Sequence, residues 1–341
     1  MLCPSRQYPM LQSRRSSLPR LLVLALSLAL GACDDANDPL APAEDPPVPA
    51  TEAAPNEAVA SGDALALTTG QRILFLSYKY GAPEIYKMDP QGNSRVHLTS
   101  ADYETTAAWS WDNKRVALVR QRPYGNSTQT DIYLINADGS NGHWAAATPS
   151  PWPVTDPSWS PDGSRLVVRL FSQNASYLGR LDVATGKLTP FNVLQGGIKG
   201  ARPSYDPTGQ RIVYIGVDYK TIEQINADGS GHKTRFSSAT WVWDPTFSPD
   251  GKKIAFARAV GTTGNNSEIF VKNLVDGTVK RLTTSAGTDN HPSWSPDGSR
   301  IAFSSQRSGV PQIWTMNAAT GGSLVRITHT ANWEEEPAWT H

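Results

Sequence analysis

A short phrase that recurs at a nearly constant interval constrains the fold of this chain more than any other feature. The letters WSPDG at residues 159–163 return as FSPDG at 247–251 and as WSPDG at 294–298, with degenerate copies WSWDN at 109–113 and YDPTG at 205–209. With a sixth aromatic at position 339, the leading aromatics at 109, 159, 205, 247, 294 and 339 are 50, 46, 42, 47 and 45 residues apart. Such a period indicates one supersecondary unit repeated six times.

Each phrase predicts a turn between two strands. Ser or Asp at its first place, Pro at the second and Gly at the fourth suit a type I turn, because proline fixes φ and glycine tolerates the left-handed backbone. Alternating apolar runs such as LVV at 166–168 follow, then a third strand such as 132–135, a hairpin turn NADG at 136–139, and a fourth strand such as 280–283. Four short antiparallel strands in about 46 residues form a propeller blade, so we expect an all-β, six-bladed β-propeller with four antiparallel strands per blade.

The ends of the repeat region indicate how the ring closes. Strands begin near Arg72 without a preceding phrase, whereas the sequence ends in Glu336-Pro-Ala-Trp339, a first strand with no blade after it. We therefore expect the C-terminal strand to complete the first blade, which leaves no open seam in the ring. The phrase aromatics repeat too regularly for a binding site, and we expect them in the core.

The frame Pro-x-Trp-Ser-Pro-Asp-Gly, then an apolar run, Asn-Ala-Asp-Gly and Arg-Leu-Thr, resembles the TolB family of WD-like repeats over residues 70–341. The resemblance implies the ring architecture and a place in the bacterial cell envelope with a protein partner. Similar propellers also occur in peptidases, lyases and adaptors, so fold alone does not give function. TolB has a further N-terminal domain that about 35 residues cannot supply, and we therefore expect a TolB-like relative of different organisation.

The first 32 residues have the features of a bacterial lipoprotein signal peptide. Basic Arg14, Arg15 and Arg20 precede a 12-residue apolar stretch at 21–32, which is too short to span a membrane. The letters LGAC at 30–33 match the site at which such a signal is cut and the cysteine acylated, so we expect lipid attachment at Cys33. Either Met1 or Met10 could be the start, and the inner or outer membrane is left open.

We expect residues 33–69 to form a lipidated, disordered tether. The segment is rich in Ala, Pro, Asp and Glu and has no periodic apolar face, so it cannot bury enough surface to fold. Without residues 1–32, which hold four Arg and no acid, the chain has 27 basic and 31 acidic residues. No basic stripe is visible, so we expect no nucleic-acid partner. The two cysteines, Cys3 and Cys33, both precede the repeats.

Polar residues recur three places before each phrase aromatic, where the chain leads into each blade. We expect them to converge at one mouth of the central channel; they are Thr106, Asp156, Arg202, Asp244, His291 and Glu336. Acids fall in the first, third and fifth blades, with Thr, Arg and His between them. This collar could bind a cation or a charged side chain of a partner. Alternatively, it is a self-neutralising set of ion pairs and turn caps that holds the segments together.

Aromatic residues precede the phrases by four to seven places. Protein hot spots are rich in aromatics, so a mouth lined by them would suit a protein partner or a sugar ring, and inter-blade packing is the alternative; these residues are Tyr103, Trp152, Trp241, Trp243 and Trp333.

No catalytic constellation can be named from the sequence. It has no Gly-x-Ser-x-Gly, phosphate-loop or His-Glu-x-x-His motif, and its six histidines lack ligand spacing. The sequence NADGS at 136–140 resembles the start of a calcium-binding loop. Because hairpin turns occupy the same place in other repeats, we expect a hairpin turn here. We expect no metal or cofactor, a monomeric propeller, and a protein-binding scaffold in the envelope. The alternative is a lyase-type or carbohydrate-binding propeller that uses the channel mouth.

Overall fold

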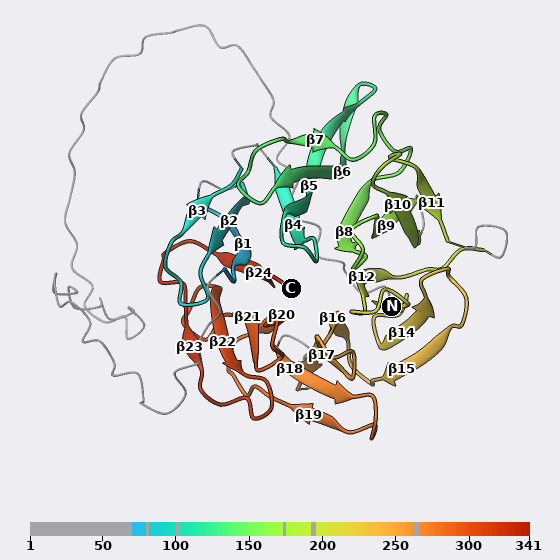
Figure 1. The fold of residues 1–341 in the computed structure, drawn as a ribbon. Helices are drawn as coiled ribbons and strands as arrows, with labels where there is room; N and C mark the ends of the chain where they lie inside the picture. The colour runs from blue at the N-terminus through green and yellow to red at the C-terminus, as the bar shows by residue number, and fades with distance from the viewer. Residues whose placement is uncertain (1–69, 80–81, 100–102, 173–174, 192–195, 262–265) are drawn as a thin grey trace, which may run out of the picture. The chain divides into compact units, whose positions relative to one another are not determined.

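The computed structural model describes residues 70–79, 82–99, 103–172, 175–191, 196–261 and 266–341. The predicted signal segment, the lipid-attachment residue Cys33 and the acidic tether lie outside these ranges. The described residues form six four-stranded antiparallel sheets arranged as blades around a common axis (Figure 1). The prediction of an all-β, six-bladed propeller is confirmed. No helix in these ranges has the length and apolar character needed to cross a bilayer.

The strands of each blade follow one another outward from the ring axis, with a single exception in blade 1. Blade 1 has the order β24-β1-β2-β3, and blades 2 to 6 comprise β4–β7, β8–β11, β12–β15, β16–β19 and β20–β23. The strands are β1 Ile73–Ser77, β2 Glu84–Met88, β3 Val96–His97, β4 Glu104–Trp109, β5 Arg115–Tyr124, β6 Ser127–Asn136, β7 His143–Trp144, β8 Val154–Trp159, β9 Arg165–Ser172, β10 Ala175–Asp182, β11 Leu188–Pro190, β12 Ala201–Tyr205, β13 Arg211–Ile215, β14 Thr221–Asn226, β15 Lys233–Ser237, β16 Val242–Phe247, β17 Lys253–Val260, β18 Asn266–Asn273, β19 Val279–Arg281, β20 Asp289–Trp294, β21 Arg300–Ser305, β22 Gln312–Asn317, β23 Val325–Arg326 and β24 Glu334–Trp339.

The repeated phrase forms the turn between the first and second strands of a blade. In blade 3 the N–H of Gly163 donates to the carbonyl of Ser160 across 2.9 Å, and Ser160 Oγ donates to Asp162 Oδ1 across 2.6 Å. Gly163 has φ +66°, and Asn113 takes the equivalent place in blade 2 with φ +57°, a conformation that asparagine tolerates better than most residues. The expected turn is therefore present in its regular and its degenerate form.

Closure of the ring also follows the prediction. Strand β24 pairs antiparallel with β1, with Trp339 opposite Ile73 and Glu334 opposite Ser77. The hydroxyl of Thr340 accepts a hydrogen bond from the N–H of Arg72. The first and last segments of the propeller thus share one sheet, and the ring has no free seam.

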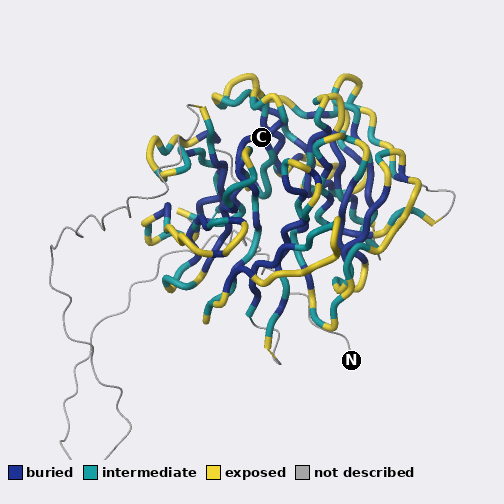
Figure 2. The backbone as a smooth tube through the Cα atoms, turned by 60° about the horizontal axis from the view of Figure 1, so that its bottom comes forward, coloured by how far each residue is buried: buried dark blue, intermediate teal, exposed yellow. Residues whose placement is uncertain are grey.

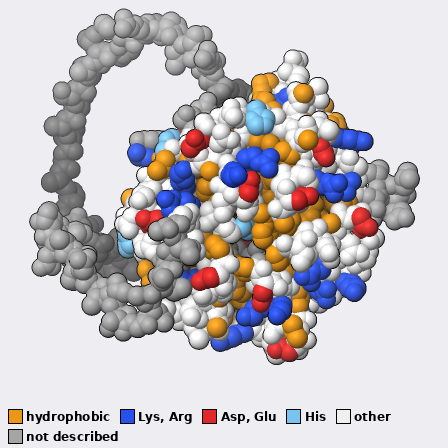
Figure 3. All heavy atoms as spheres, in the orientation of Figure 1, with side chains coloured by type: hydrophobic (Ala, Val, Ile, Leu, Met, Phe, Trp, Pro, Cys, Tyr) orange, Lys and Arg blue, Asp and Glu red, His pale blue; other side chains and the backbone are white. Residues whose placement is uncertain are grey.

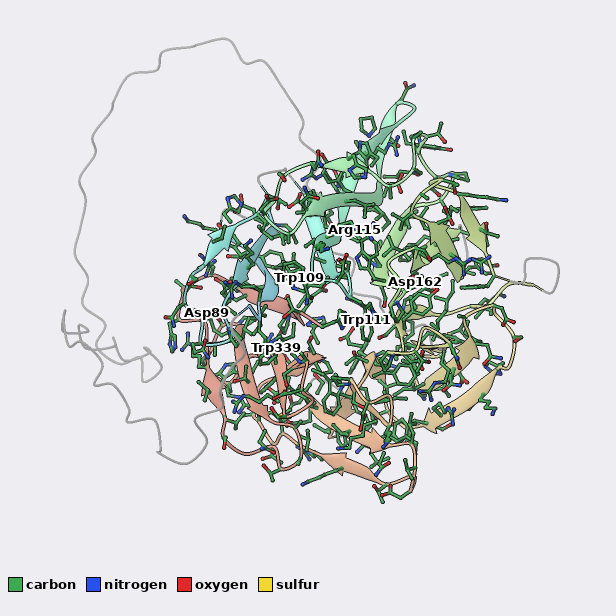
Figure 4. All side chains as sticks on the ribbon, viewed as in Figure 1. Asp89, Trp109, Trp111, Arg115, Asp162 and Trp339 are labelled. Carbon is green, nitrogen blue, oxygen red and sulfur yellow. The ribbon has the colours of Figure 1, made fainter. Side chains whose placement is uncertain are left out.

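The core lies between blades. Six buried apolar clusters occur, one at each interface of adjacent blades, and Figure 2 shows buried strands with exposure concentrated in the turns. The phrase aromatics are 1 to 6% exposed, which confirms their predicted place; they are Trp109, Trp159, Tyr205, Phe247, Trp294 and Trp339. In Figure 4, Trp109 and Trp339 lie toward the middle of the ring and Asp89 nearer its rim.

Turn residues also join neighbouring blades. The guanidinium of Arg115 in blade 2 donates to the carbonyl of Gly163 in blade 3 across 2.9 Å and lies over the ring of Trp159. Arg211 in blade 4 does the same to Gly251 and Phe247 of blade 5. Cation–π and charge-assisted contacts of this kind add to the buried area between blades.

Candidate functional site

Six residues of the innermost strands share an unusual backbone. Each blade has a register shift in the pairing of its first and second strands, as expected of a β-bulge. The residue at each shift has φ between +44° and +54°; these are Thr106, Asp156, Arg202, Asp244, His291 and Glu336. They are the predicted collar residues, and they lie within strands rather than in the connecting loops. We call these six residues the collar.

The collar lines one cavity on the ring axis. Its volume is about 140 Å³, and its wall is made by all six collar residues together with the residue that follows each of them, which is proline in every blade except blade 2. A residue before proline is normally pushed away from helical backbone, so the left-handed bulge is imposed by the sheet and turns six side chains toward one point. The six residues that share one place in the repeat therefore line one cavity.

Arg202 contacts all three carboxylates of the collar. Its guanidinium donates to Glu336 across 3.1 Å and lies 3.3 Å from Asp244 and 3.8 Å from Asp156. Its backbone N–H also donates to Asp156 Oδ2 across 3.2 Å. Burial tends to lower the pKa of Arg202, but the three carboxylates raise it well above its usual value. Arg202 therefore stays charged and is the centre of an ion-pair network.

His291 bridges two of the same acids. Its Nε2 lies 3.6 Å from both Asp244 and Glu336, and its Nδ1 lies 3.4 Å from the hydroxyl of Ser304. Burial tends to raise the pKa of Glu336, yet the charges of Arg202 and His291 and the hydrogen bonds to that carboxylate lower it below its usual range. The arrangement fits the self-neutralising alternative, with three carboxylates facing one guanidinium and one imidazole.

Two charged residues near the collar were not expected from the sequence. Arg169 of β9 lies 3.8 Å from Asp156 and donates to the hydroxyl of Tyr219 across 3.0 Å. Glu335 has a raised pKa because it is buried and faces Glu336, although His291 and Arg202 oppose that shift. The one sequence signal for Arg169 was a lone charge within the apolar run LVVRL at 166–170.

The predicted aromatic residues do not line the collar cavity. Trp243 packs on the core between blades 5 and 6, which fits the packing alternative. Trp152 lines a separate pocket of about 230 Å³ with Tyr177 and Leu170. Trp241 contacts Trp243 edge-to-face, and Trp333 lies 6.3 Å from the ring of Tyr78.

The exposed aromatics nevertheless share one face of the propeller. In a four-stranded antiparallel blade, the turn between strands two and three and the connection to the next blade lie on the same side. All exposed Trp and Tyr side chains of the described residues lie in or at the ends of these segments, with 38 to 51% of their surface exposed. They are Tyr103, Tyr124, Trp152, Trp241 and Trp333. We call this side the aromatic face; Val217, 64% exposed, lies on it too. The sequence analysis missed Tyr124 and Val217, which precede no phrase.

The opposite face carries the repeated turns and the hairpins. In the NADG hairpin the N–H of Gly139 donates to the carbonyl of Asn136, and the carboxylate of Asp138 accepts from the N–H of Ser140. Asp138 therefore stabilises the turn. Within the described ranges no three or more His, Cys, Asp or Glu side chains are arranged to hold a metal ion. Basic and acidic side chains are interspersed on the surface seen in Figure 3.

Comparison with known proteins shows which propellers this chain is similar to. The TolB β-propeller domain family matches residues 201–341. The Tol-Pal system protein TolB of Francisella tularensis is 29% identical over 184 residues, which cover 54% of this chain and 32% of that relative. The match thus spans about a third of the length of these curated relatives.

Two solved structures have the same fold. The crystal structure of TolB from Acinetobacter baumannii superposes with a TM-score of 0.66 at 19% identity, over 79% of this chain and 66% of that one. The structure of putative TolB from Agrobacterium tumefaciens gives 0.59 at 16% identity, over 78% of this chain and 91% of that one. At these identities the likeness concerns the architecture alone.

Proposed function

Because the described part of this chain is a TolB-like six-bladed β-propeller, we propose that it acts as a protein-binding scaffold in the bacterial cell envelope, held at a membrane by lipid on Cys33. The relatives named as Tol-Pal system proteins support an envelope role with protein partners. The observation that carries the proposal is the gathering of exposed aromatics on one face. Aromatic side chains supply large contact area at low entropic cost and dominate interface hot spots.

The collar supports the same proposal in a secondary way. The three carboxylates of the collar outnumber the two guanidiniums that contact them, those of Arg202 and Arg169, so ion pairing leaves a small excess of acidic groups at the ring axis. A partner that brings a lysine or arginine to the axis would gain attraction there, and its apolar side chains would pack on the aromatic face. Charge complementarity of this kind chiefly sets orientation and association rate.

The binding role is tested by affinity isolation from detergent-solubilised envelopes with the full-length protein as bait. The proposal expects one envelope protein in stoichiometric amount, lost when Trp241→Ala removes an exposed side chain of the aromatic face. Val275→Ala is the matched control, because Val275 is 77% exposed in a hairpin of the opposite face. Retention of the partner by Trp241→Ala together with its loss in Val275→Ala would place binding on the other face.

The anchor is tested separately. Metabolic labelling with a radioactive fatty acid is expected to mark the wild-type protein and to leave Cys33→Ser unlabelled and released from the membrane fraction. Labelling of Cys33→Ser, or membrane retention without label, would contradict lipid attachment at that residue. The scaffold role does not depend on this result, since a propeller binds its partner through its own surface.

A further inference from the structure

A third cavity lies away from the ring axis, between the outer parts of blades 4 and 5. Its volume is about 500 Å³. One wall is the end of β15 and the segment after it, and the other is formed by β17 with Arg281 of β19; Figure 1 shows these strands in neighbouring blades. No collar residue lines it. The connection after β15 and the end of β17 form its walls, and Thr240 is next to Trp241, so the pocket opens on the aromatic face and is separate from the collar.

Within the part of the chain that the structure describes, the guanidinium of Arg258 in this pocket has no anionic partner. Among the described residues it forms no ion pair and no hydrogen bond, and its one contact of note is with the face of the Phe270 ring, 3.9 Å from the centroid. Unpaired half-buried guanidiniums are costly, since the charge loses water without gaining a counter-charge. Burial and the neighbouring charge of Arg281 lower the pKa of Arg258.

Glu268, which lies opposite Arg258 in the sheet, is already fully engaged. One carboxylate oxygen accepts from Arg281 across 3.0 Å and from the N–H of Ser285 across 2.7 Å, and the other accepts from the hydroxyl of Thr283. Arg281 itself therefore has its charge matched. The pocket is left with the uncompensated charge of Arg258 and with the outward edge of Arg281, whose side chain is 40% exposed.

The facing wall offers hydroxyl groups. Ser237, Ser238 and Thr240 all line the pocket. Thr240 Oγ1 is committed to the carbonyl of Ala259 across 2.7 Å, and Ser238 interacts with Thr240. The hydroxyl of Ser237 has no hydrogen-bond partner within the described ranges. Two guanidiniums on one side and free hydroxyl capacity on the other make a pocket that complements an oxyanion.

We propose that this pocket between blades 4 and 5 binds a phosphate group, with Arg258 as its principal contact. A carboxylate has two oxygens in one plane and is satisfied by a single guanidinium fork. A phosphate presents three oxygens in different directions, which suits donors on two opposed walls. The size of the cavity admits a phosphate together with part of the molecule that carries it, so a free phosphorylated solute and a phospholipid headgroup share the required chemistry.

The test uses the purified full-length protein and calorimetric titration with inorganic phosphate, with acetate as the carboxylate probe. Because Arg258→Gln removes a charge-assisted hydrogen bond to the phosphate, it is expected to weaken phosphate binding about tenfold or more. Arg165→Gln, a change at an exposed arginine of blade 3 outside the pocket, is the matched control and should bind as the wild type does. Thermal melting of both variants checks that they fold.

Each result bears on the proposal. No phosphate binding by the wild type, or equal binding by Arg258→Gln and the wild type, would overturn it, as would acetate binding as tight as phosphate binding. A tenfold loss confined to Arg258→Gln supports it. A soluble short-chain phosphatidic acid then separates the sources, because tighter binding than inorganic phosphate indicates a lipid headgroup and equal binding indicates a free phosphorylated solute. Phosphate binding is measured on Arg258→Gln and partner capture on Trp241→Ala, so failure of one proposal is distinguishable from failure of the other.

Discussion

Arg202 Nη2 donates a hydrogen bond to Glu336 Oε1 across 3.1 Å, although the two residues are 134 positions apart in the chain. Arg202 belongs to blade 4 and Glu336 to the strand that completes blade 1. In a ring of six these blades face each other, so the pair spans the axis. The contact closes the ring axis at the level of the collar and ties the last strand of the chain to the far side of the propeller.

Removing the cation of this pair is expected to destabilise the fold. Arg202→Met leaves Asp156, Asp244 and Glu336 facing one another without their shared guanidinium. Because this network is only partly buried, the expected cost is about 1 to 3 kcal/mol. Urea unfolding at pH 7 should show that loss. Arg165→Met on the exposed surface should change stability by less than about 0.5 kcal/mol. Equal midpoints for the two variants would contradict the network.

The lowered pKa of Glu336 gives a signed pH dependence. A carboxyl whose pKa is lower in the folded state than its usual 4.5 contributes stability above that value and loses it as the pH falls through the folded pKa. The stability difference between wild type and Glu336→Gln should therefore be full at pH 6 and decline below about pH 4.5. Urea unfolding across this pH range measures it. A difference that stays constant, or grows toward low pH, would contradict the lowered pKa.

Backbone strain in the collar can be measured at Thr106. This β-branched residue has φ +44°, a conformation that costs L-residues about 1 to 2 kcal/mol and suits asparagine better. Thr106→Asn is expected to raise the free energy of unfolding by about 1 kcal/mol. Thr105→Asn, one position earlier in the same strand, should lower it by up to about 1 kcal/mol because asparagine fits ordinary strand backbone poorly. Changes of the same sign in both variants would argue against the strain.

Trp339 and Trp333 allow the contribution of ring closure to stability to be measured apart from the surface proposed to bind a partner. Trp339 is 3% exposed in the cluster between blades 1 and 6, whereas Trp333 is 51% exposed on the aromatic face. Trp339→Ala is expected to cost about 3 to 5 kcal/mol in chemical unfolding, and Trp333→Ala less than about 0.5 kcal/mol. A small cost for Trp339→Ala would mean that the last strand does not hold the ring closed.

The spacing of the phrase predicted more of the molecule than any single motif could. A period fixed by aromatics places equivalent residues at equivalent points of a ring, so the collar and the closure by Trp339 were both accessible from the sequence. The pairing inside the collar was not, because which acid Arg202 reaches depends on side-chain length across the axis. The left-handed backbone of six residues before proline also runs against the local preference of the sequence and is imposed by sheet register.

The pocket between blades 4 and 5 and two residues of the aromatic face, Tyr124 and Val217, could not be predicted from the repeated phrase. Arg258 and Ser237 are 21 positions apart, in different blades, and neither belongs to the repeated phrase. Their proximity depends on how blades 4 and 5 pack at the rim. Tyr124 is exposed because β5 and β6 extend to ten residues each, an insertion that period counting absorbs as a slightly longer repeat.

Site-specific photocrosslinking in living cells tests the central claim, that a protein partner docks on the aromatic face, most directly. A photoreactive amino acid is placed at Trp241, at Trp333 and, as the control on the opposite face, at Val275. The account predicts that the first two positions crosslink the same envelope protein and that Val275 does not. Crosslinks from Val275 alone, or different proteins captured at Trp241 and Trp333, would contradict it.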